Sequence, residues 1–216
     1  ETVERVSGAL DATTALIGFS GAPWTVATYM VEGRGSRNFE HTKLWAFGDP
    51  KTFGQLIDMI IEATIAYLSR QIDAGAEVVQ LFDTWANALS ETAFARWCIE
   101  PTQRIVGALR ETYPNVPVIG FPRGVGVALI DYAARTGVQG IGLDSAVPAA
   151  WAQQEIQCQC TIQGNLDPLM LVAGGTAMTN EVRRITAVLK NGPFVFNLGH
   201  GILPHTPPDH VAELVA

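Results

Sequence analysis

The chain has 216 residues, of which 48% are hydrophobic and only 16% charged, and these proportions exclude a disordered chain. Its 14 Lys and Arg against 21 Asp and Glu give a net charge of −7, which argues against a nucleic-acid partner bound through a broad basic face. The length fits one large α/β domain, and we expect a single domain over residues 1–216.

No apolar run approaches the roughly 18 residues of a membrane span, and the first residues do not resemble a secretory signal. We therefore expect a cytoplasmic protein with no membrane partner. Helical spacing already begins at Val3, and a helix with Thr206 as its predicted N-cap and Pro207 at its first position is cut off at Ala216. We expect the chain to be a piece of a longer one.

Six short segments rich in apolar and β-branched residues are typical of buried parallel strands. They are residues 15–19, 78–82, 116–121, 140–143, 161–166 and 194–198. Between them lie helical patterns at residues 50–75, 91–112, 124–135 and 179–190. The first follows the N-cap Asp49, and Pro101 should break or kink the second. This alternation predicts an α/β fold with parallel strands and right-handed crossovers.

Polar or conformationally special residues follow each predicted strand. They occupy residues 20–23, 83–84, 122–124, 144–145, 167–168 and 199–201. In parallel α/β folds the carboxyl ends of the strands hold the active site, so we expect the site to be built from these six turns. No glycine-rich turn matches a dinucleotide or P-loop motif, which disfavours nucleotide binding. Residues 32–38 are expected to form a mobile loop.

The turns and their flanks resemble the uroporphyrinogen decarboxylase family of porphyrin biosynthesis. The matching stretches run through nearly the whole chain in the family's order. They are Leu16 to Thr25, Thr28 with Tyr29, Glu32 with Gly33, Gln80 to Trp85, Phe121 to Gly124, Gln163 to Pro168 and Phe196 to Pro204. The resemblance implies a (β/α)8 TIM barrel, of which this chain would supply about the last six βα units. It also implies a homodimer.

The resemblance further implies an activity, the decarboxylation of the four acetate side chains of uroporphyrinogen III to give coproporphyrinogen III. No metal or organic cofactor is implied, because an electron-rich pyrrole that is protonated on carbon can itself accept the electron pair that decarboxylation releases. Family site positions carry over to Tyr29, Thr84 and His200. All three are candidates for binding substrate, and Tyr29 and His200 are also candidates for catalysis. Their alternative roles are a core aromatic, a turn cap and a structural histidine.

The family's catalytic aspartate and an arginine-rich stretch that binds substrate carboxylates match no position of this chain. The 216 residues alone are therefore expected to be inactive, and poorly soluble if two strand edges stay exposed. Because a protein of charge −7 repels a substrate with eight carboxylates, cations must lie close to the site. Arg123 is the candidate at a strand end, with Arg34 and Arg37 in the loop, and each could instead be a solvated surface arginine.

Three carboxylates at the ends of predicted strands are further candidates for a chemical role. Asp167 precedes Pro168 and is expected to be an N-cap, whereas a direct chemical role for Asp83 and Asp144 stays open. The five tryptophans are expected to be packing residues, and the three cysteines small buried hydrophobic residues. The cysteines are Cys98, Cys158 and Cys160.

Two other functions compete with decarboxylation. One is a zinc-dependent corrinoid methyltransferase of the same superfamily, and the other is a non-catalytic barrel fragment. Cys158 and Cys160 are expected on a strand, where their side chains would face opposite sides and could not bind one zinc ion together. Histidines at a spacing of five residues, from His200 to His210, do not align on one helix face either. We expect no metal.

Overall fold

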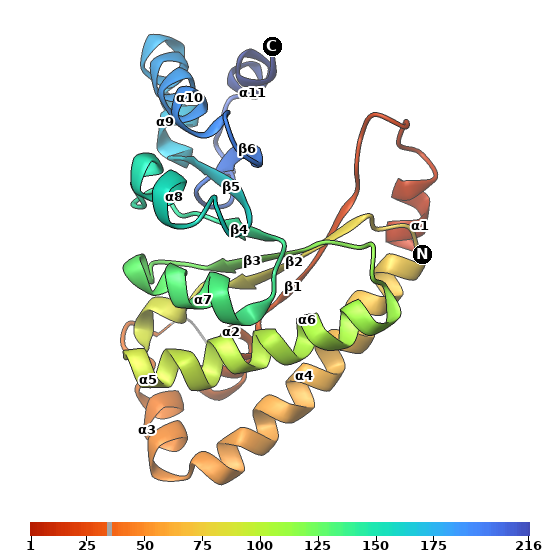
Figure 1. The fold of residues 1–216 in the computed structure, drawn as a ribbon, viewed down its shortest axis with the longest axis vertical. Coiled ribbons are helices and arrows are strands. Elements are labelled where there is room, and N and C mark those ends of the chain that lie inside the picture. Colours follow the sequence, from red (N-terminus) through yellow and green to blue (C-terminus); the bar gives the residue numbers. More distant parts are fainter. Residues whose placement is uncertain (34–35) are drawn as a thin grey trace. The chain divides into compact units, whose positions relative to one another are not determined.

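The computed structural model describes residues 1–33 and 36–216 (Figure 1). Arg34, one of the expected cations, lies outside the described residues, as does Gly35. The described residues form two compact units, residues 1–139 and 140–216. Each unit contains three parallel strands in chain order with helices between them, so the predicted strand–helix alternation is confirmed. The expected single domain over residues 1–216 stays a prediction.

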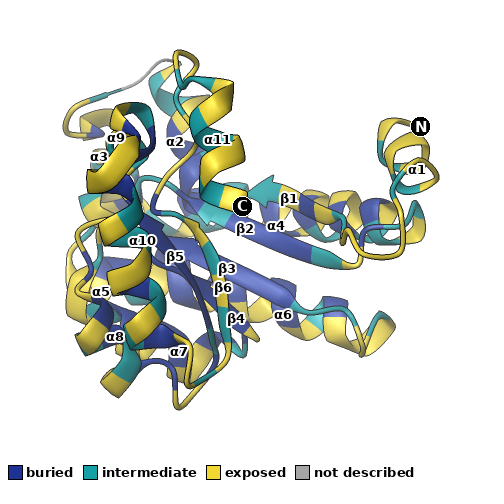
Figure 2. Cartoon of the chain, turned by 90° about the horizontal axis from the view of Figure 1, so that it is seen from above, coloured by how far each residue is buried: buried dark blue, intermediate teal, exposed yellow. Residues whose placement is uncertain are grey.

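The first unit is built on three strands, β1 (Ile17–Gly21), β2 (Val78–Asp83) and β3 (Val118–Pro122). β2 pairs in parallel with both neighbours, with Gly18 opposite Val79 and Leu81 opposite Gly120. The helices and helical turns of this unit are α1 (Thr2–Ser7), α2 (Pro23–Glu32), α3 (Glu40–Gly48), α4 (Pro50–Asp73), η1 (Ala86–Ala88), α5 (Glu91–Phe94), η2 (Ala95–Ile99), α6 (Glu100–Thr112), η3 (Gly126–Ala128) and α7 (Leu129–Thr136). Figure 2 shows buried residues along β2 and β3.

α4 is the helix that the sequence predicts most clearly. Asp49 caps its start by accepting a hydrogen bond from the Thr52 amide at 3.1 Å, and Pro50 occupies the first helical position. Its buried face includes Phe53, Ile57, Ile60, Ile61 and Leu68, at the spacing of one helix face. The chain leaves the helix through Gly75, whose φ of +106° favours glycine.

The predicted break near Pro101 is a π-helical turn. η2 lies between α5 and α6 and ends at Ile99, two residues before the proline. Proline cannot donate a backbone hydrogen bond, and a wider turn is one way in which a helix accommodates that loss. The turn brings Cys98 and Trp97 into the core.

β1 differs from the expected buried strand, because Ile17 and Phe19 are 40% and 59% exposed. The exposed residues alternate with buried Gly18, as they do on a strand that has one covered face. On the covered side the Gln71 side chain, from α4, binds the Phe19 backbone twice. Its amide nitrogen donates to the Phe19 carbonyl and its oxygen accepts from the Phe19 amide, both at 2.9 Å. A side chain at position 18 would collide with Gln71.

The second unit contains β4 (Gly140–Gly142), β5 (Thr161–Leu166) and β6 (Phe194–Leu198), paired in parallel. Its helices are α8 (Ala149–Glu155), α9 (Pro168–Ala173), α10 (Gly175–Leu189) and α11 (Pro208–Val215). β6 alternates between half-buried and exposed residues, so the expectation of a fully buried strand is wrong here too.

Two predicted helix caps of the second unit have different outcomes. Asp167 caps α9 as expected, since its carboxylate accepts from the Leu169 amide at 2.8 Å. Thr206 does not cap α11, because that helix begins one residue later, at Pro208, with Pro207 as its N-cap. Thr206 Oγ1 is buried and has no hydrogen-bond partner among the described residues. None of the helices formed by those residues is long and apolar enough to cross a membrane.

Candidate active site

The turns that follow β1, β2 and β3 are joined by backbone hydrogen bonds. The Ala22 amide donates to the Phe82 carbonyl at 2.8 Å, and the Arg123 amide donates to the Asp83 carbonyl at 3.1 Å. Three of the six predicted turns therefore lie side by side at the carboxyl ends of neighbouring parallel strands, where α/β enzymes place their sites.

Tyr29 lies on α2, a helix that the sequence argument does not predict. Its side chain is 50% exposed, and its ring meets the Trp85 ring edge to face, with the centroids 6.3 Å apart. Thr84, which is half-buried, directly precedes Trp85. The first unit thus brings Tyr29 and the segment that carries Thr84 together, although they are far apart in sequence.

α2 and the turn after β2 are tied by three further hydrogen bonds. The Thr25 hydroxyl donates to Asp83 Oδ1 at 2.6 Å, and its oxygen accepts from the Trp85 amide at 3.3 Å. The Trp24 indole N–H donates to the Trp85 carbonyl at 3.0 Å. Neither Thr25 nor Trp85 belongs to a recognisable catalytic sequence motif. The hydrogen bond between them can therefore be seen only in the structure.

Asp83 is buried, with 1% of its surface exposed, so it does not present its carboxylate to a ligand. Burial raises the pKa of this carboxyl group, while hydrogen bonds from Cys98 and Thr25 offset part of the rise. The buried Cys98 thiol beside it has a raised pKa, first because of burial and then because of the negative charge of Asp83. Burial also raises the pKa of the Tyr132 phenol nearby. The geometry gives Asp83 a structural task rather than a direct chemical one.

The raised pKa of Asp83 predicts how stability depends on pH. The folded protein holds this proton to a higher pH than the unfolded chain, so the contribution of Asp83 to stability is full below its ordinary pKa of 3.8 and is lost as pH rises. Asp83→Asn, which does not ionise, should therefore gain stability over the wild type by about 1.4 kcal/mol for each unit by which the pKa is raised. Urea unfolding of the full-length protein at about pH 4.5 and pH 8 measures this gain. A difference that is the same at both pH values would contradict the prediction.

The candidate cations of the first unit are more exposed to solvent than Asp83. Arg123 is half-buried and Arg37 is exposed. The end of α2 is anchored by Glu32, whose carboxylate accepts from the Thr42 amide at 3.0 Å and from the Thr42 hydroxyl at 2.9 Å. Burial works to raise the pKa of Glu32, but these bonds lower it overall. The mobility expected for residues 32–38 stays a prediction.

The second unit carries His200 in the turn after β6. His200 is exposed, and its Nδ1 accepts a hydrogen bond from the Gly201 amide at 2.7 Å. In the neutral ring the proton is then on Nε2, which makes that nitrogen a donor. Gly199 is buried against Ser145, and its amide donates to the Leu166 carbonyl at 2.7 Å. The turns after β4, β5 and β6 are therefore held together within this unit.

Asp144, the other carboxylate left open by the sequence, accepts from the Ala146 amide at 2.9 Å. Its own carbonyl accepts from the side-chain amide of Asn165, which also donates to Val147, each at 2.8 Å. These bonds fix the turn after β4 to β5. A direct chemical role for Asp144 stays a hypothesis.

The expectations for two cysteines are wrong. Cys158 is exposed rather than buried, and both Cys158 and Cys160 lie in the turn between α8 and β5 rather than on a strand. The amides of Gln159 and Cys160 both donate to the Ile156 carbonyl, and these turn hydrogen bonds keep the segment out of the strand that begins at Thr161. In residues 1–33 and 36–216, no group of three or more His, Cys, Asp or Glu side chains could hold a metal ion.

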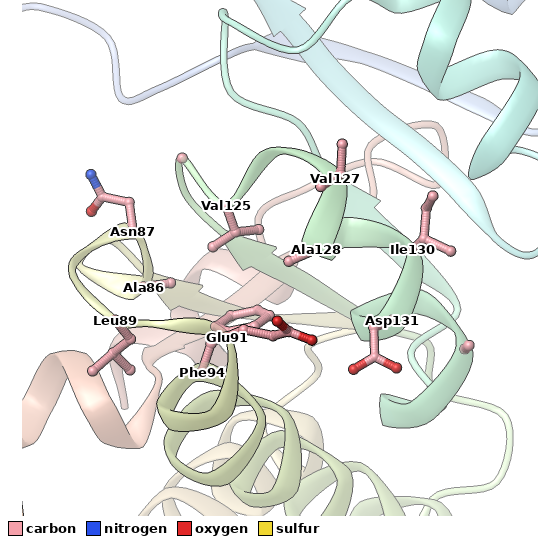
Figure 3. Close-up of a pocket in the computed structure, with 12 residues that line it drawn as sticks. Ala86, Asn87, Leu89, Glu91, Phe94, Val125, Val127, Ala128, Ile130 and Asp131 are labelled. Carbon is pink, nitrogen blue, oxygen red and sulfur yellow. The ribbon is translucent and has the colours of Figure 1, made fainter. Parts of the chain in front are cut away.

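One cavity of about 640 Å³ lies beside the first unit's turns (Figure 3). It is bordered by the segments after β2 and β3, and its wall combines apolar side chains such as Phe94 and Val125 with the carboxylates of Glu91 and Asp131. Tyr29, Thr84 and Arg123 do not line it. The cavity is therefore separate from the candidate residues of the first unit, which lie on α2 and in the turns after β2 and β3.

Comparisons with solved structures establish the fold. A methyltransferase from Methanosarcina mazei superposes with a TM-score of 0.82 at 21% identity, over 99% of this chain and 60% of that one. A putative vitamin-B12 independent methionine synthase from Listeria monocytogenes has a TM-score of 0.63 at 13% identity, over 99% of this chain and 67% of that one. These likenesses show a shared fold alone, and they agree with the predicted α/β architecture of the (β/α)8 type.

The sequence comparisons are more specific. The family described as "Uroporphyrinogen decarboxylase (URO-D)" matches residues 1–216. Uroporphyrinogen decarboxylase from Rhodospirillum rubrum is 55% identical over the whole chain, and that from Granulibacter bethesdensis is 50% identical. The chain spans 62% and 64% of the lengths of these two relatives. The resemblance at the turns is thus confirmed along the full sequence, and the chain belongs to the uroporphyrinogen decarboxylase family.

Proposed function

We propose that the full-length protein removes carbon dioxide from the four acetate side chains of uroporphyrinogen III and releases coproporphyrinogen III, as a carboxy-lyase of porphyrin biosynthesis. The family match over residues 1–216, with relatives about half identical, carries this proposal. The substrate's own pyrrole acts as the electron sink, so the reaction needs no metal or organic cofactor. The protein's tasks are to stabilise a cationic ring and to place a proton.

Three candidate residues, which lie on α2, in the turn after β2 and in the turn after β6, suit supporting parts of this reaction. Tyr29 and Thr84 offer hydroxyl groups that can donate to a substrate carboxylate or accept from a pyrrole N–H. His200, with the proton of its neutral ring on Nε2, can donate to an acetate or propionate group and can also deliver a proton. The stabilising carboxylate of the family has no counterpart in this chain, so we assign no residue to that part.

An apolar group of the first unit, on β1, β2 and β3, fits the pyrrole rings. The Phe19, Phe82 and Phe121 side chains, from β1, β2 and β3, meet edge to face, with centroids 5.8 Å apart in each neighbouring pair. Phe19 is 59% exposed at the open end of this row. The exposed Phe19 ring offers apolar surface against which a pyrrole ring can pack, which supports a substrate whose ring is apolar and whose arms are charged.

The charged arms call for cations near the turns. The chain's net charge of −7 repels an anion with eight carboxylates at long range, but a close arginine outweighs that field. Arg123 lies in the turn after β3, next to the segment that carries Thr84, and we propose it as a ligand of one carboxylate. Arg37 remains a weaker candidate, because it lies on the exposed segment before α3.

Tyr29→Phe tests the part proposed for the phenol. In the full-length protein we expect kcat/KM to fall about tenfold, because one hydrogen bond to the substrate is lost while the ring contact with Trp85 remains. Chromatography of the products by carboxylate number should also show more partly decarboxylated intermediates. Tyr67→Phe is the matched control, since Tyr67 is exposed on α4. An unchanged rate and product distribution in Tyr29→Phe would remove the hydroxyl from the site.

The assembly and location of the protein are part of the same proposal. We propose a cytoplasmic homodimer, on the basis of the family alone, and equilibrium sedimentation of the full-length protein tests the dimer. The competing function, a zinc-dependent corrinoid methyltransferase, has no support beyond a shared fold at 21% identity, which favours neither function. Stoichiometric zinc that only strong chelators remove would favour it over the decarboxylase.

A further inference from the structure

We infer that Thr25 is a positioning residue, whose hydroxyl group, held by Asp83, fixes the backbone of Trp85 and through it the ring against which Tyr29 lies. The inference takes its catalytic meaning from the proposed decarboxylase function. Thr25 does not contact the proposed substrate itself, because it is only 4% exposed.

The Thr25 hydroxyl both donates and accepts a hydrogen bond. A hydroxyl has one hydrogen to donate and lone pairs to accept with. Asp83 Oδ1 takes the hydrogen at 2.6 Å, which leaves a lone pair for the Trp85 amide at 3.3 Å. Asp83 is the last residue of β2, so the bonds run from the strand end through α2 to the turn two residues further along. Thr25 thereby fixes where α2 begins relative to that turn.

Trp85 is held through its backbone and through contacts of its ring. Its amide donates to Thr25, its carbonyl accepts from the Trp24 indole at 3.0 Å, and its ring lies against the rings of Phe39 and Tyr29. The centroid of Phe39 is 5.0 Å away, and that residue is itself buried. Tyr29 is the most exposed of the three rings, and its contact with the Trp85 ring ties its orientation to that of Trp85.

The chemistry of the pair argues against simple packing. Valine has nearly the shape of threonine, and an apolar residue in place of Asp83 would avoid the cost of a buried carboxyl group. Burial raises the pKa of Asp83, which shows that its ionised form is disfavoured where it lies. The two polar side chains provide a directional hydrogen bond to the Trp85 amide. An apolar pair could not provide it.

The test compares Thr25→Val, Thr25→Ser and Thr25→Cys in the full-length protein. Valine should lower kcat about tenfold with less than a twofold change in KM, raise the share of partly decarboxylated products and speed hydrogen exchange of the Trp85 amide. Serine keeps the hydroxyl and should stay within about twofold of wild type in each measurement. Cysteine, a weak donor, should rank between them, and the order of serine and cysteine still tests the inference if the valine variant does not fold.

Thr136→Val is the matched control. Thr136 is a buried threonine of the same unit whose hydroxyl donates to the Tyr132 carbonyl at 2.7 Å, so the same exchange removes one comparable bond. Its Tm should fall, while kcat and the product distribution stay unchanged.

Two results would overturn the inference. One is a wild-type kcat in Thr25→Val, and the other is an equal loss in the serine and valine variants. If the wild-type protein proves inactive on uroporphyrinogen, the proposed function fails instead, and hydrogen exchange of the Trp85 amide in the serine and valine variants still decides whether Thr25 holds that residue.

Discussion

Replacing His200 by alanine in the full-length protein is expected to lower kcat/KM for uroporphyrinogen by about 100-fold. The Gly201 amide binds Nδ1 at 2.7 Å, so in the neutral ring Nε2 carries the proton and is the donor. A hydrogen bond from such a donor to a substrate carboxylate contributes about 1.5–3 kcal/mol, and the upper end of that range corresponds to about 100-fold in rate. The readouts are the rate of carbon dioxide release and the carboxylate number of the products.

His205→Ala provides the control for the His200 variant. His205 is an exposed histidine five residues further along the same segment, and its replacement should leave both readouts unchanged. His200→Ala should also unfold at the urea concentration of the wild type, because the exposed ring buries little surface. Wild-type kinetics in His200→Ala would remove this histidine from the proposed site.

Gly199→Ala is expected to destabilise the protein by about 2–3 kcal/mol and to lower activity as well. An added Cβ would overlap the backbone nitrogen and the hydroxyl of Ser145 and would lie 2.9 Å from Ser145 Cα. Backbone atoms cannot rotate away as a flexible side chain can, and Gly199 is also fixed by its bond to the Leu166 carbonyl. The turn must therefore move, and His200 moves with it.

Urea unfolding and decarboxylase assays of the Gly199→Ala protein measure both effects. Gly201→Ala is the control, because no atom lies within 4 Å of the Cβ that it would add. Its free energy of unfolding should stay within about 0.5 kcal/mol of the wild type. Equal losses in the two variants would show that the close approach of Gly199 to Ser145 is not the cause.

The elements that the sequence predicts well are those defined by local chemistry. Asp49 and Asp167 each precede a proline and cap the helix that follows, because capping needs only a side-chain oxygen and an amide two or three residues away. The strands at residues 161–166 and 194–198 have the predicted bounds, since residues typical of turns and helix caps follow both of them.

The sequence pattern does not predict α2, because part of its buried face consists of threonines. Its buried residues include Thr25 and Thr28, and an argument from apolar periodicity does not count threonines as core. The site depends on the same helix. The residue types at Tyr29, Thr84 and His200 follow from family resemblance, but the bond between Thr25 and Trp85 joins residues 60 positions apart and follows only from the fold.

The bidentate contact of Gln71 has a consequence for how the first unit can associate. Alternate residues of β1 bond to β2, as the Leu16 carbonyl and the Ala22 amide do, so the backbone of Phe19 points to the outer side of the strand. There the primary amide of Gln71 imitates the peptide group of an adjoining strand. An incoming chain must displace this mimic before it can add to the sheet at Phe19. The Gln71 amide thus occupies the position on β1 at which another strand would bond, whether that strand belongs to the same barrel or to a second molecule.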